Sequence, residues 1–144
     1  MKISTKGRYA LRLMLDLAVY NTGKPVSLKD VAKRQGISEK YLEQIISVLN
    51  KAGYVSSIRG AQGGYLLKRE PADYTVGMIL RQIEGDLSPV NCVGYNKVEC
   101  ERKNECTTSI VWEKINDAIN NVVDNITLED LVKWRAEKNT DYVI

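Results

Sequence analysis

Hydrophobic residues recur at helical spacing in the first part of the chain. Tyr9, Leu13 and Leu17 follow one another at intervals of four residues, which predicts an amphipathic helix over about residues 5–21. The polar segment from Asn21 to Pro25 carries a glycine and a proline, and it ends that helix. The chain therefore opens with one helix that buries a single face.

Two shorter helices are predicted next, joined by a tight turn. Ser27 is a suitable N-cap for a helix that ends at Gly36, and Ser38 is a suitable N-cap for a helix from Glu39 to about Ala52. Two helices joined by a glycine-containing turn form a helix-turn-helix, whose second helix enters the major groove of DNA.

After Gly53 the pattern changes to that of a β-hairpin. Residues 54–58 and 65–67 are predicted strands, and residues 59–64 form a glycine-rich tip. A hairpin directly after a recognition helix is a wing. A flexible hairpin without a DNA contact is the alternative, although Arg59 at the tip favours contact with the minor groove.

Thr75 is predicted to cap a fourth helix that ends at Gly85. Residues 86–106 then form a loop of about 20 residues, a length that is unusual in a compact domain unless a ligand or partner orders it. The loop contains all three cysteines of the chain.

The longest apolar helical stripe begins at Thr107 and includes Ile115, Ile119 and Val122. Because the preceding DNA-binding domain already looks complete, this helix is expected to pair with a copy of itself in a two-fold dimer rather than pack on its own chain. Thr127 is expected to cap a last short helix, and the tail from Ala136 gives little signal.

The predicted fold is thus mainly α, an α+β arrangement with one small hairpin. We expect a winged helix-turn-helix DNA-binding domain over residues 1–85 and a cysteine-bearing cofactor loop over residues 86–106. A long C-terminal dimerisation helix and a final helix occupy residues 107–144.

The charge is distributed unevenly between the two halves. Residues 1–70 hold 13 Lys and Arg against 5 Asp and Glu, whereas the remaining 74 residues hold 8 against 13. A basic first half suits contact with phosphates and an acidic second half suits a protein partner or cofactor, although a scattered solvated surface would give the same count. A homodimer on a palindromic double-stranded DNA operator is the expected assembly.

The polar side chains at the start of the recognition helix and at the wing tip are the candidates for contact with DNA. Gln44 suits an adenine edge, and Glu43 suits a cytosine amino group while repelling phosphate. Phosphate contacts are expected from other positions. The full set of candidates is Ser38, Lys40, Tyr41, Glu43 and Gln44 on the helix, Arg59, Gly60, Gln62 and Gly63 on the wing, and Lys6 and Tyr9 at the start of the first helix.

Cys92, Cys100 and Cys106 lie within fifteen residues, in a chain without histidine. Three loop thiolates are the usual protein contribution to an iron–sulfur cluster, which is the favoured interpretation. Zinc is disfavoured because a structural zinc site takes four protein ligands and only oxygen donors are left for the fourth. A thiol–disulfide switch helped by nearby Lys and Arg, or three inert cysteines, are the remaining alternatives.

Three segments together carry a resemblance to a known family: residues 1–10, residues 41–44 and the wing over residues 59–67. They resemble the IscR/NsrR/CymR family of bacterial transcriptional regulators over nearly the whole chain. The resemblance implies a dimeric winged helix regulator with a long C-terminal dimerisation helix. It also implies a cluster in those members that carry a cysteine triplet before this helix, as the IscR-like branch does. The family's cysteine-metabolism regulators generally lack the triplet.

The fourth cluster ligand departs from the family pattern. The IscR-like histidine, three positions after the last cysteine, is replaced here by Ser109, and the acidic N-terminal ligand of nitric-oxide-sensing members by Arg8. The resemblance favours a [2Fe–2S] over a [4Fe–4S] cluster, with the fourth ligand unknown. The candidates for it are Glu99, Glu101, Glu105, Ser109, a carboxylate of the partner chain, solvent and a small thiol.

The alternative function is a cysteine-metabolism-type repressor, controlled by a regulatory partner protein or by a thiol switch and without a cluster. An enzyme is not expected, because the chain has no histidine, no phosphate-binding glycine loop before a helix and no nucleophile with an evident base. A cytoplasmic protein without a membrane span is expected, since no apolar run approaches about 20 residues and the cysteine count is odd.

Overall fold

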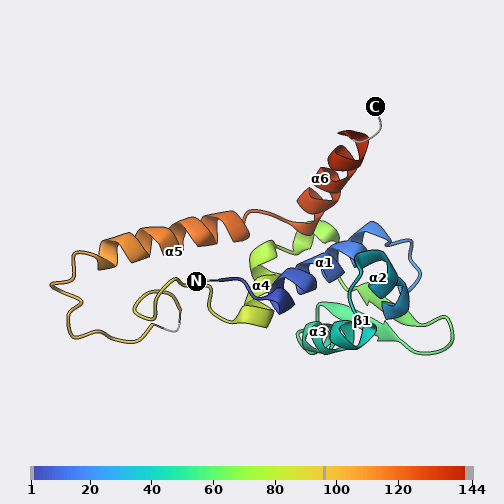
Figure 1. The fold of residues 1–144 in the computed structure, drawn as a ribbon, viewed down its shortest axis with the longest axis horizontal. Helices are drawn as coiled ribbons and strands as arrows, with labels where there is room; N and C mark the ends of the chain where they lie inside the picture. Colours follow the sequence, from blue (N-terminus) through green and yellow to red (C-terminus); the bar gives the residue numbers. More distant parts are fainter. Residues whose placement is uncertain (1, 96, 142–144) are drawn as a thin grey trace.

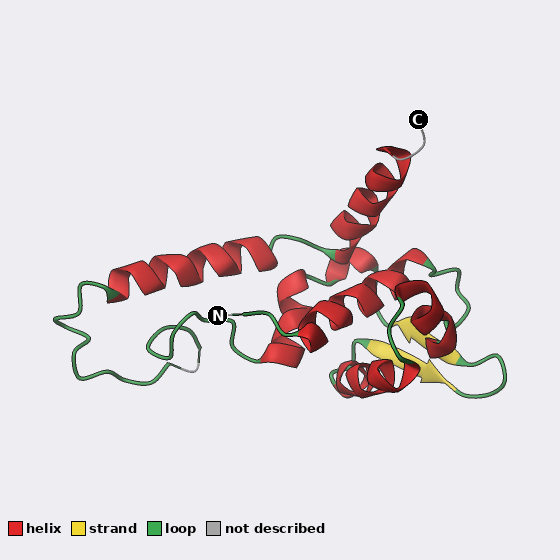
Figure 2. Ribbon diagram, in the orientation of Figure 1, coloured by secondary structure: helices red, strands yellow, loops and turns green. Residues whose placement is uncertain are grey.

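The computed structural model describes residues 2–95 and 97–141, which form six α-helices, one short 3₁₀ helix and a two-stranded antiparallel sheet. The elements are α1 (Thr5–Val19), α2 (Leu28–Gln35), α3 (Glu39–Lys51), β1 (Val55–Ile58), β2 (Gly64–Leu67), η1 (Pro71–Asp73), α4 (Val76–Glu84), α5 (Ser109–Val123) and α6 (Leu128–Asp141). Figure 1 shows α1 to α4 and the sheet packed together, and Figure 2 shows how little of the chain is strand. The predicted mainly α winged helix fold is confirmed.

The predicted helix starts are confirmed where a side chain caps the helix. The hydroxyls of Ser27, Ser38 and Thr75 accept hydrogen bonds from backbone N–H groups at 3.2, 3.1 and 3.1 Å, which satisfies donors that have no partner inside the helix. Gly36 ends α2 in the left-handed conformation, at φ +65°, as its position after the helix predicts.

Several expected boundaries are corrected by the structure. The helix expected from Thr107 begins at Ser109, because Thr108 makes no side-chain cap bond. That helix has 15 residues, the same length as α1, so the apolar stripe that is longest in the sequence does not form a longer helix than α1. The last helix runs to Asp141, past the point where the sequence gave little signal, and an ion pair between Glu129 and Lys133 at 3.2 Å supports its helical spacing.

The main core lies between α1, α3 and the base of the sheet. Leu13 and Met14 of α1 and Leu42, Ile45 and Leu49 of α3 are fully buried. They belong to the two apolar stripes that the sequence pattern predicts, so the same periodicity that forms each helix also joins the two. Because α3 packs on α1 through its apolar face, the polar face of α3 points toward solvent.

Tyr74 fixes the base of the wing to this core. Its ring is fully buried, and its hydroxyl donates to the Tyr54 carbonyl at 2.6 Å while it accepts from the N–H groups of Lys68 and Arg69, both at 3.1 Å. Burial raises the pKa of Tyr74, so the hydroxyl keeps its proton for this bond. One side chain thereby holds both ends of the hairpin.

We call the part from α1 to α4, with the sheet, the reader domain, and residues 86–108 the cysteine loop. Figure 1 shows α5 extending away from the reader domain, with the cysteine loop at its far end. The start of α6 returns to the reader domain, where Leu128 is fully buried against the main core. The two ends of α5 therefore lie in different surroundings.

Candidate DNA interface and cysteine cavity

The recognition helix α3 presents the predicted polar residues to solvent. Lys40, Glu43 and Gln44 are exposed, because the buried stripe of α3 occupies the opposite face. Ser38 is exposed as well, but its hydroxyl already accepts the N–H of Tyr41 at 3.1 Å. Ser38 therefore acts as the N-cap of α3, and any contact that it makes with a DNA phosphate would be additional to that role.

Tyr41 is half-buried rather than free, since it meets Tyr9 of α1 edge to face. The ring centroids are 5.7 Å apart at an interplanar angle of 86°, and the guanidinium carbon of Arg12 lies 5.4 Å from the Tyr9 ring. The structure thus brings together two predicted DNA contacts from different helices. Lys6, two residues before Arg8 at the start of α1, is half-buried.

An ion pair that the sequence analysis did not predict holds α2 against α1. Asp16 is only 2% exposed, and it accepts from Arg34 Nη2 at 2.7 Å, from Arg34 Nε at 3.1 Å and from Gln35 Nε2 at 3.0 Å. Arg34 also stacks on Tyr20, with 3.9 Å between the guanidinium carbon and the ring centroid. The sequence does contain a signal for this pair, namely a carboxylate on the apolar face of the first helix, next to Leu17. A charge that is buried in this way requires a partner.

The wing is built from close backbone packing around its glycines. β1 and β2 pair from Val55 opposite Leu67 to Ile58 opposite Gly64. Val26, just before α2, adds two backbone hydrogen bonds with Tyr65, of 2.8 and 3.0 Å. A Cβ on Gly64 would collide with the Val26 carbonyl, so only glycine permits this contact.

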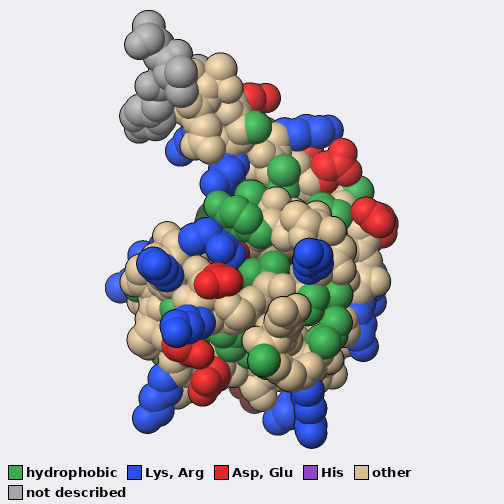
Figure 3. All heavy atoms as spheres, turned by 90° about the vertical axis from the view of Figure 1, so that its right-hand side faces the viewer, with side chains coloured by type: hydrophobic (Ala, Val, Ile, Leu, Met, Phe, Trp, Pro, Cys, Tyr) green, Lys and Arg blue, Asp and Glu red, His purple; other side chains and the backbone are tan. Residues whose placement is uncertain are grey.

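The wing tip carries the other predicted contacts. Arg59, Gly60 and Gln62 are exposed, whereas Gly63 is half-buried because its Cα lies against the Ile58 carbonyl. Figure 3 shows Lys and Arg side chains projecting from the lower edge of this end of the molecule, at the level of α3 and the sheet in Figure 1. Part of the positive charge therefore lies on the side where the recognition helix and wing would meet DNA.

The three cysteines line one cavity of about 290 Å³ at the start of α5. All three are free thiols; Cys100 is exposed, and Cys92 and Cys106 are half-buried. Among the described residues, no three His, Cys, Asp or Glu side chains lie close enough together to hold a metal ion. The fold thus brings the predicted ligands to one cavity without bringing them to ligand distance of a common point.

Only some of the candidates for the fourth ligand line this cavity. Glu99 and Ser109 line it, whereas Glu101 and Glu105 are not among its lining residues. Glu105 instead lines a neighbouring cavity with Cys106. Glu113, which the sequence analysis did not single out, also lines the cysteine cavity.

The Cys106 thiol is polarised toward the thiolate. The Thr108 hydroxyl lies 3.3 Å from its sulfur, and this hydrogen bond is the main reason that the pKa of Cys106 is lowered. The backbone N–H of Ser109 and the charge of Arg102 act in the same direction. A thiolate is the form that binds metals and attacks disulfides.

α5 leaves most of its apolar side chains uncovered. Ile110 and Val122 are 51% and 57% exposed, and α5 has no buried residue within the described chain. Near the reader domain its last turns form a wholly apolar groove with residues of α4 and the segments next to it. The lining residues are Ile3, Leu80, Leu87, Ala118, Ile119, Val122 and Val123.

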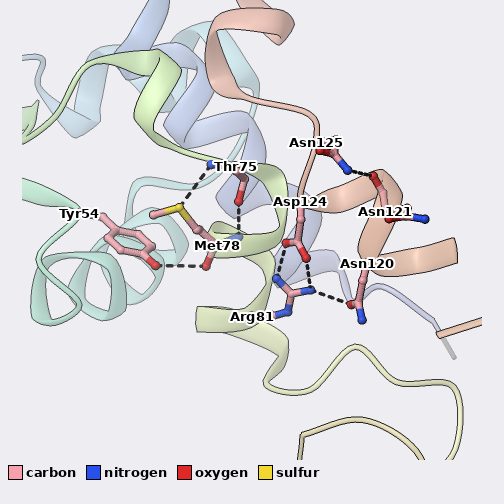
Figure 4. A network of polar contacts seen from close by, with 8 residues as sticks. All are labelled: Tyr54, Thr75, Met78, Arg81, Asn120, Asn121, Asp124 and Asn125. Atoms are coloured by element: carbon pink, nitrogen blue, oxygen red, sulfur yellow. Dashed lines mark hydrogen bonds and ion pairs between the residues drawn. The ribbon is translucent and has the colours of Figure 1, made fainter. Parts of the chain in front are cut away.

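The end of α5 is clamped to α4 by polar contacts. Figure 4 shows Arg81 of α4 reaching Asp124 and Asn120. Its guanidinium donates to the two Asp124 carboxylate oxygens at 2.6 and 3.1 Å and to the Asn120 side-chain oxygen at 2.8 Å. Gly77 lies beneath this contact, where a Cβ would meet both Asp124 and Arg81. We call these contacts the Arg81 clamp; they fix the direction in which α5 leaves the reader domain.

No helix in the described part of the chain combines the length and apolar character that crossing a membrane requires.

Comparison with known proteins finds transcriptional regulators. The family model Rrf2, an iron-dependent transcriptional regulator, matches residues 3–134. The HTH-type transcriptional regulator CymR of Bacillus subtilis is 44% identical over 143 residues, covering 99% of this chain and 98% of CymR. The HTH-type transcriptional regulator IscR of Pectobacterium atrosepticum is 40% identical over 139 residues, covering 96% of this chain and 84% of that protein.

Two solved structures have the same fold. CymR, the global cysteine regulator of B. subtilis, superposes with a TM-score of 0.77 at 46% identity, over 93% of this chain and 98% of that chain. IscR of T. potens superposes with a TM-score of 0.77 at 47% identity, over 96% of this chain and 90% of that chain. Proteins of both names are thus about equally similar to this chain, and all of these relatives are named as regulators rather than enzymes.

Proposed function

The chain belongs to the Rrf2 family of transcriptional regulators, as its sequence motifs suggested, and we propose that it is a dimeric, operator-binding repressor that senses an iron–sulfur cluster. Cys92, Cys100 and Cys106 would hold the cluster. The observation that carries this proposal is that three free thiols line one cavity at the start of α5, whose other end is clamped to the reader domain.

The residues of the cavity fit such a group by their chemistry. Thiolates are the donors that iron–sulfur clusters take from proteins, and the lowered pKa of Cys106 favours the thiolate. When bound, the cluster would supply a redox- and iron-dependent link between the three sulfurs. The donor set is that of a cluster rather than of a single ion, because the thiolates of a cluster bind different irons and need not converge on one point.

A group bound by the three cysteines would act on the reader domain through α5. The cysteine loop enters α5 at Ser109, and the Arg81 clamp ties the other end of α5 to α4. A change in how α5 meets a second copy would alter the separation of the two recognition helices. Coupling of this kind amounts to about 1–3 kcal/mol, enough to change operator occupancy roughly 5- to 150-fold.

Dimerisation is proposed from the uncovered apolar side of α5. An apolar surface of this extent on a soluble protein marks an interaction site, and a second copy of α5 is the occupant that the helical pattern favours. A two-fold dimer would present two α3 helices to successive major grooves of a palindromic operator, with Gln44 and Glu43 facing base edges.

We expect Arg59→Ala to weaken operator binding by about 1–3 kcal/mol and to lower the salt dependence of binding, because one exposed cation at the wing tip would no longer meet the DNA. Fluorescence anisotropy with labelled operator across a salt series measures both effects. Lys24→Ala, which removes an exposed cation between α1 and α2, is the matched control. An Arg59→Ala protein with unchanged affinity at every salt concentration would contradict a DNA-contacting wing.

We expect Cys100→Ala to abolish visible absorbance after anaerobic purification while the dimer remains folded, since Cys100 is exposed and its removal leaves no void in the core. Absorption between about 320 and 600 nm, with iron and acid-labile sulfide per chain, measures the loss. Glu101→Gln, next to Cys100 but outside the cavity lining, serves as the control. Full absorbance in the alanine variant would exclude Cys100 as a ligand.

A second candidate is a cysteine-metabolism-type repressor that responds to a partner protein or a thiol switch without a cluster. The similarity to CymR favours it, and the lowered pKa of Cys106 suits a redox-active thiol. The acidic C-terminal half would then be the docking surface for the partner. Iron analysis separates the candidates, because this function predicts a colourless, iron-free protein that still binds DNA.

A further inference from the structure

Three cysteine thiolates leave one protein ligand of a cluster unassigned. Iron–sulfur clusters in proteins take four protein ligands as a rule, most often thiolates and in some cases nitrogen donors. The chain has no fourth cysteine and no histidine, so a further protein ligand has to be an oxygen donor. Within a single chain, the oxygen donors that line the cysteine cavity are Glu99, Ser109, Glu113 and the side-chain amide of Asn104.

Glu113 is the acidic residue with the most central position. Besides the cysteine cavity, it lines a second cavity of about 140 Å³ that also contains Cys92. Among the described residues, no other acidic side chain lines both cavities. Glu113 therefore contributes to the walls of both cavities, as Cys92 does.

Ser109 is a weaker donor than its position suggests. Its hydroxyl donates to the Cys106 carbonyl at 2.7 Å, and this bond helps the chain enter α5. A serine oxygen would also have to lose a proton before it bound iron, whereas a carboxylate is ionised at neutral pH. Glu99 is also a carboxylic acid, but it lies in the cysteine loop next to Cys100 rather than on a helix.

Glu113 differs because it is on a helix. α5 holds its backbone in place one turn after Ser109, on the same side of the helix. The three thiols lie on the loop before α5, so a ligand on α5 would attach the bound group to a helix as well as to the loop. Binding would then connect the loop to the helix that the Arg81 clamp orients.

The surrounding charges are compatible with an anionic ligand at this position. Lys97 and Lys103 line both cavities, and they are the two cations in either lining. Three thiolates and a carboxylate carry four negative charges, and two ammonium groups within the same walls reduce their mutual repulsion.

We infer that the Glu113 carboxylate is the fourth ligand of the group held by Cys92, Cys100 and Cys106. The inference rests on the proposed cluster function. It assigns the ligand role to a residue of α5 rather than to the serine at the position of the histidine of IscR-like regulators. It also means that the bound group would link the cysteine loop to α5.

The test compares anaerobically purified full-length wild type with Glu113→Gln, Glu99→Gln and Ser109→Ala. The measurements are iron and sulfide per chain before and after gel filtration, the visible and electron paramagnetic resonance spectra, and the reduction potential. Glu113→Gln is expected to lose at least half of its iron on the column and to shift both spectra. It should also raise the potential, because one negative charge is removed. Glu99→Gln and Ser109→Ala are expected to match wild type.

Glu113→Cys provides a gain-of-ligand measurement. It should retain iron at least as well as wild type and give a spectrum typical of four thiolates. If wild type is coloured while Glu113→Gln and Glu113→Cys both keep its spectrum and iron content, the inference is overturned and the proposed function stands. The inference is also overturned if Glu99→Gln alone loses iron. A wild-type protein without iron or colour overturns the proposed function itself. Far-ultraviolet circular dichroism of each variant shows whether it is folded, so that a loss of iron is not caused by misfolding.

Discussion

Val122→Glu is expected to convert the protein from a dimer into a folded monomer and to lower operator affinity roughly 100-fold or more. Val122 is 57% exposed in the single chain and lines the apolar groove between α5 and α4. A carboxylate there costs the monomer little, because water still reaches it. In a two-fold dimer the substitution occurs twice in one interface, where each charge would lose its water without gaining a partner.

The affinity falls because the two reader domains are no longer joined in one dimer. Two recognition helices on one dimer bind as one unit, so the second half-site is engaged at high effective concentration. A monomer keeps the exposed face of α3 and the wing but has to bind each half-site separately. Analytical ultracentrifugation gives the oligomeric state, and operator anisotropy gives the affinity.

Asn121→Glu provides the matched control. It adds the same charge to the neighbouring residue of α5, but Asn121 is exposed and outside the groove lining. We expect it to remain a dimer with near wild-type operator affinity. A Val122→Glu protein that sediments as a dimer would show that this groove is not where the two copies meet.

Local hydrogen bonding explains how much of the fold could be predicted from sequence. Ser27, Ser38 and Thr75 each cap a helix through an N–H three residues away, and Gly36 ends a helix through its own backbone. Interactions of this range are contained in a short stretch of sequence, so the pattern predicts them. Thr107 and Thr108 look like caps but make no cap bond, and there the predicted start was two residues early.

The features that position the candidate site depend on partners far apart in the chain. Arg81 and Asp124 are 43 residues apart, and Tyr74 holds the wing from outside the hairpin. No periodicity relates such residues, because the fold alone brings them together. The cysteine triplet was predictable since its members are close in sequence, whereas Glu113 was not, because its cavity forms only when α5 and the cysteine loop are placed together.

The buried ion pair between α1 and α2 gives the largest expected effect on stability. Arg34→Met is expected to lower the free energy of unfolding by about 3–5 kcal/mol, because it leaves the Asp16 carboxylate buried with only the Gln35 amide to bond it. The hydrogen bond with Asp16 raises the pKa of Arg34, so the guanidinium keeps its positive charge next to the buried carboxylate. Urea unfolding followed by circular dichroism measures the change.

Two comparisons separate this pair from an ordinary surface contact. Lys133→Met removes the exposed pair with Glu129 on α6 and should cost no more than about 0.5 kcal/mol. The double variant Asp16→Leu with Arg34→Met should recover most of the loss, because no unpaired charge then remains in the core. If the double variant is as unstable as Arg34→Met alone, the penalty does not come from the buried carboxylate. Because the pair sets α2 against α1, and α2 in turn supports α3, Arg34→Met should also weaken operator binding at temperatures where the protein is still folded.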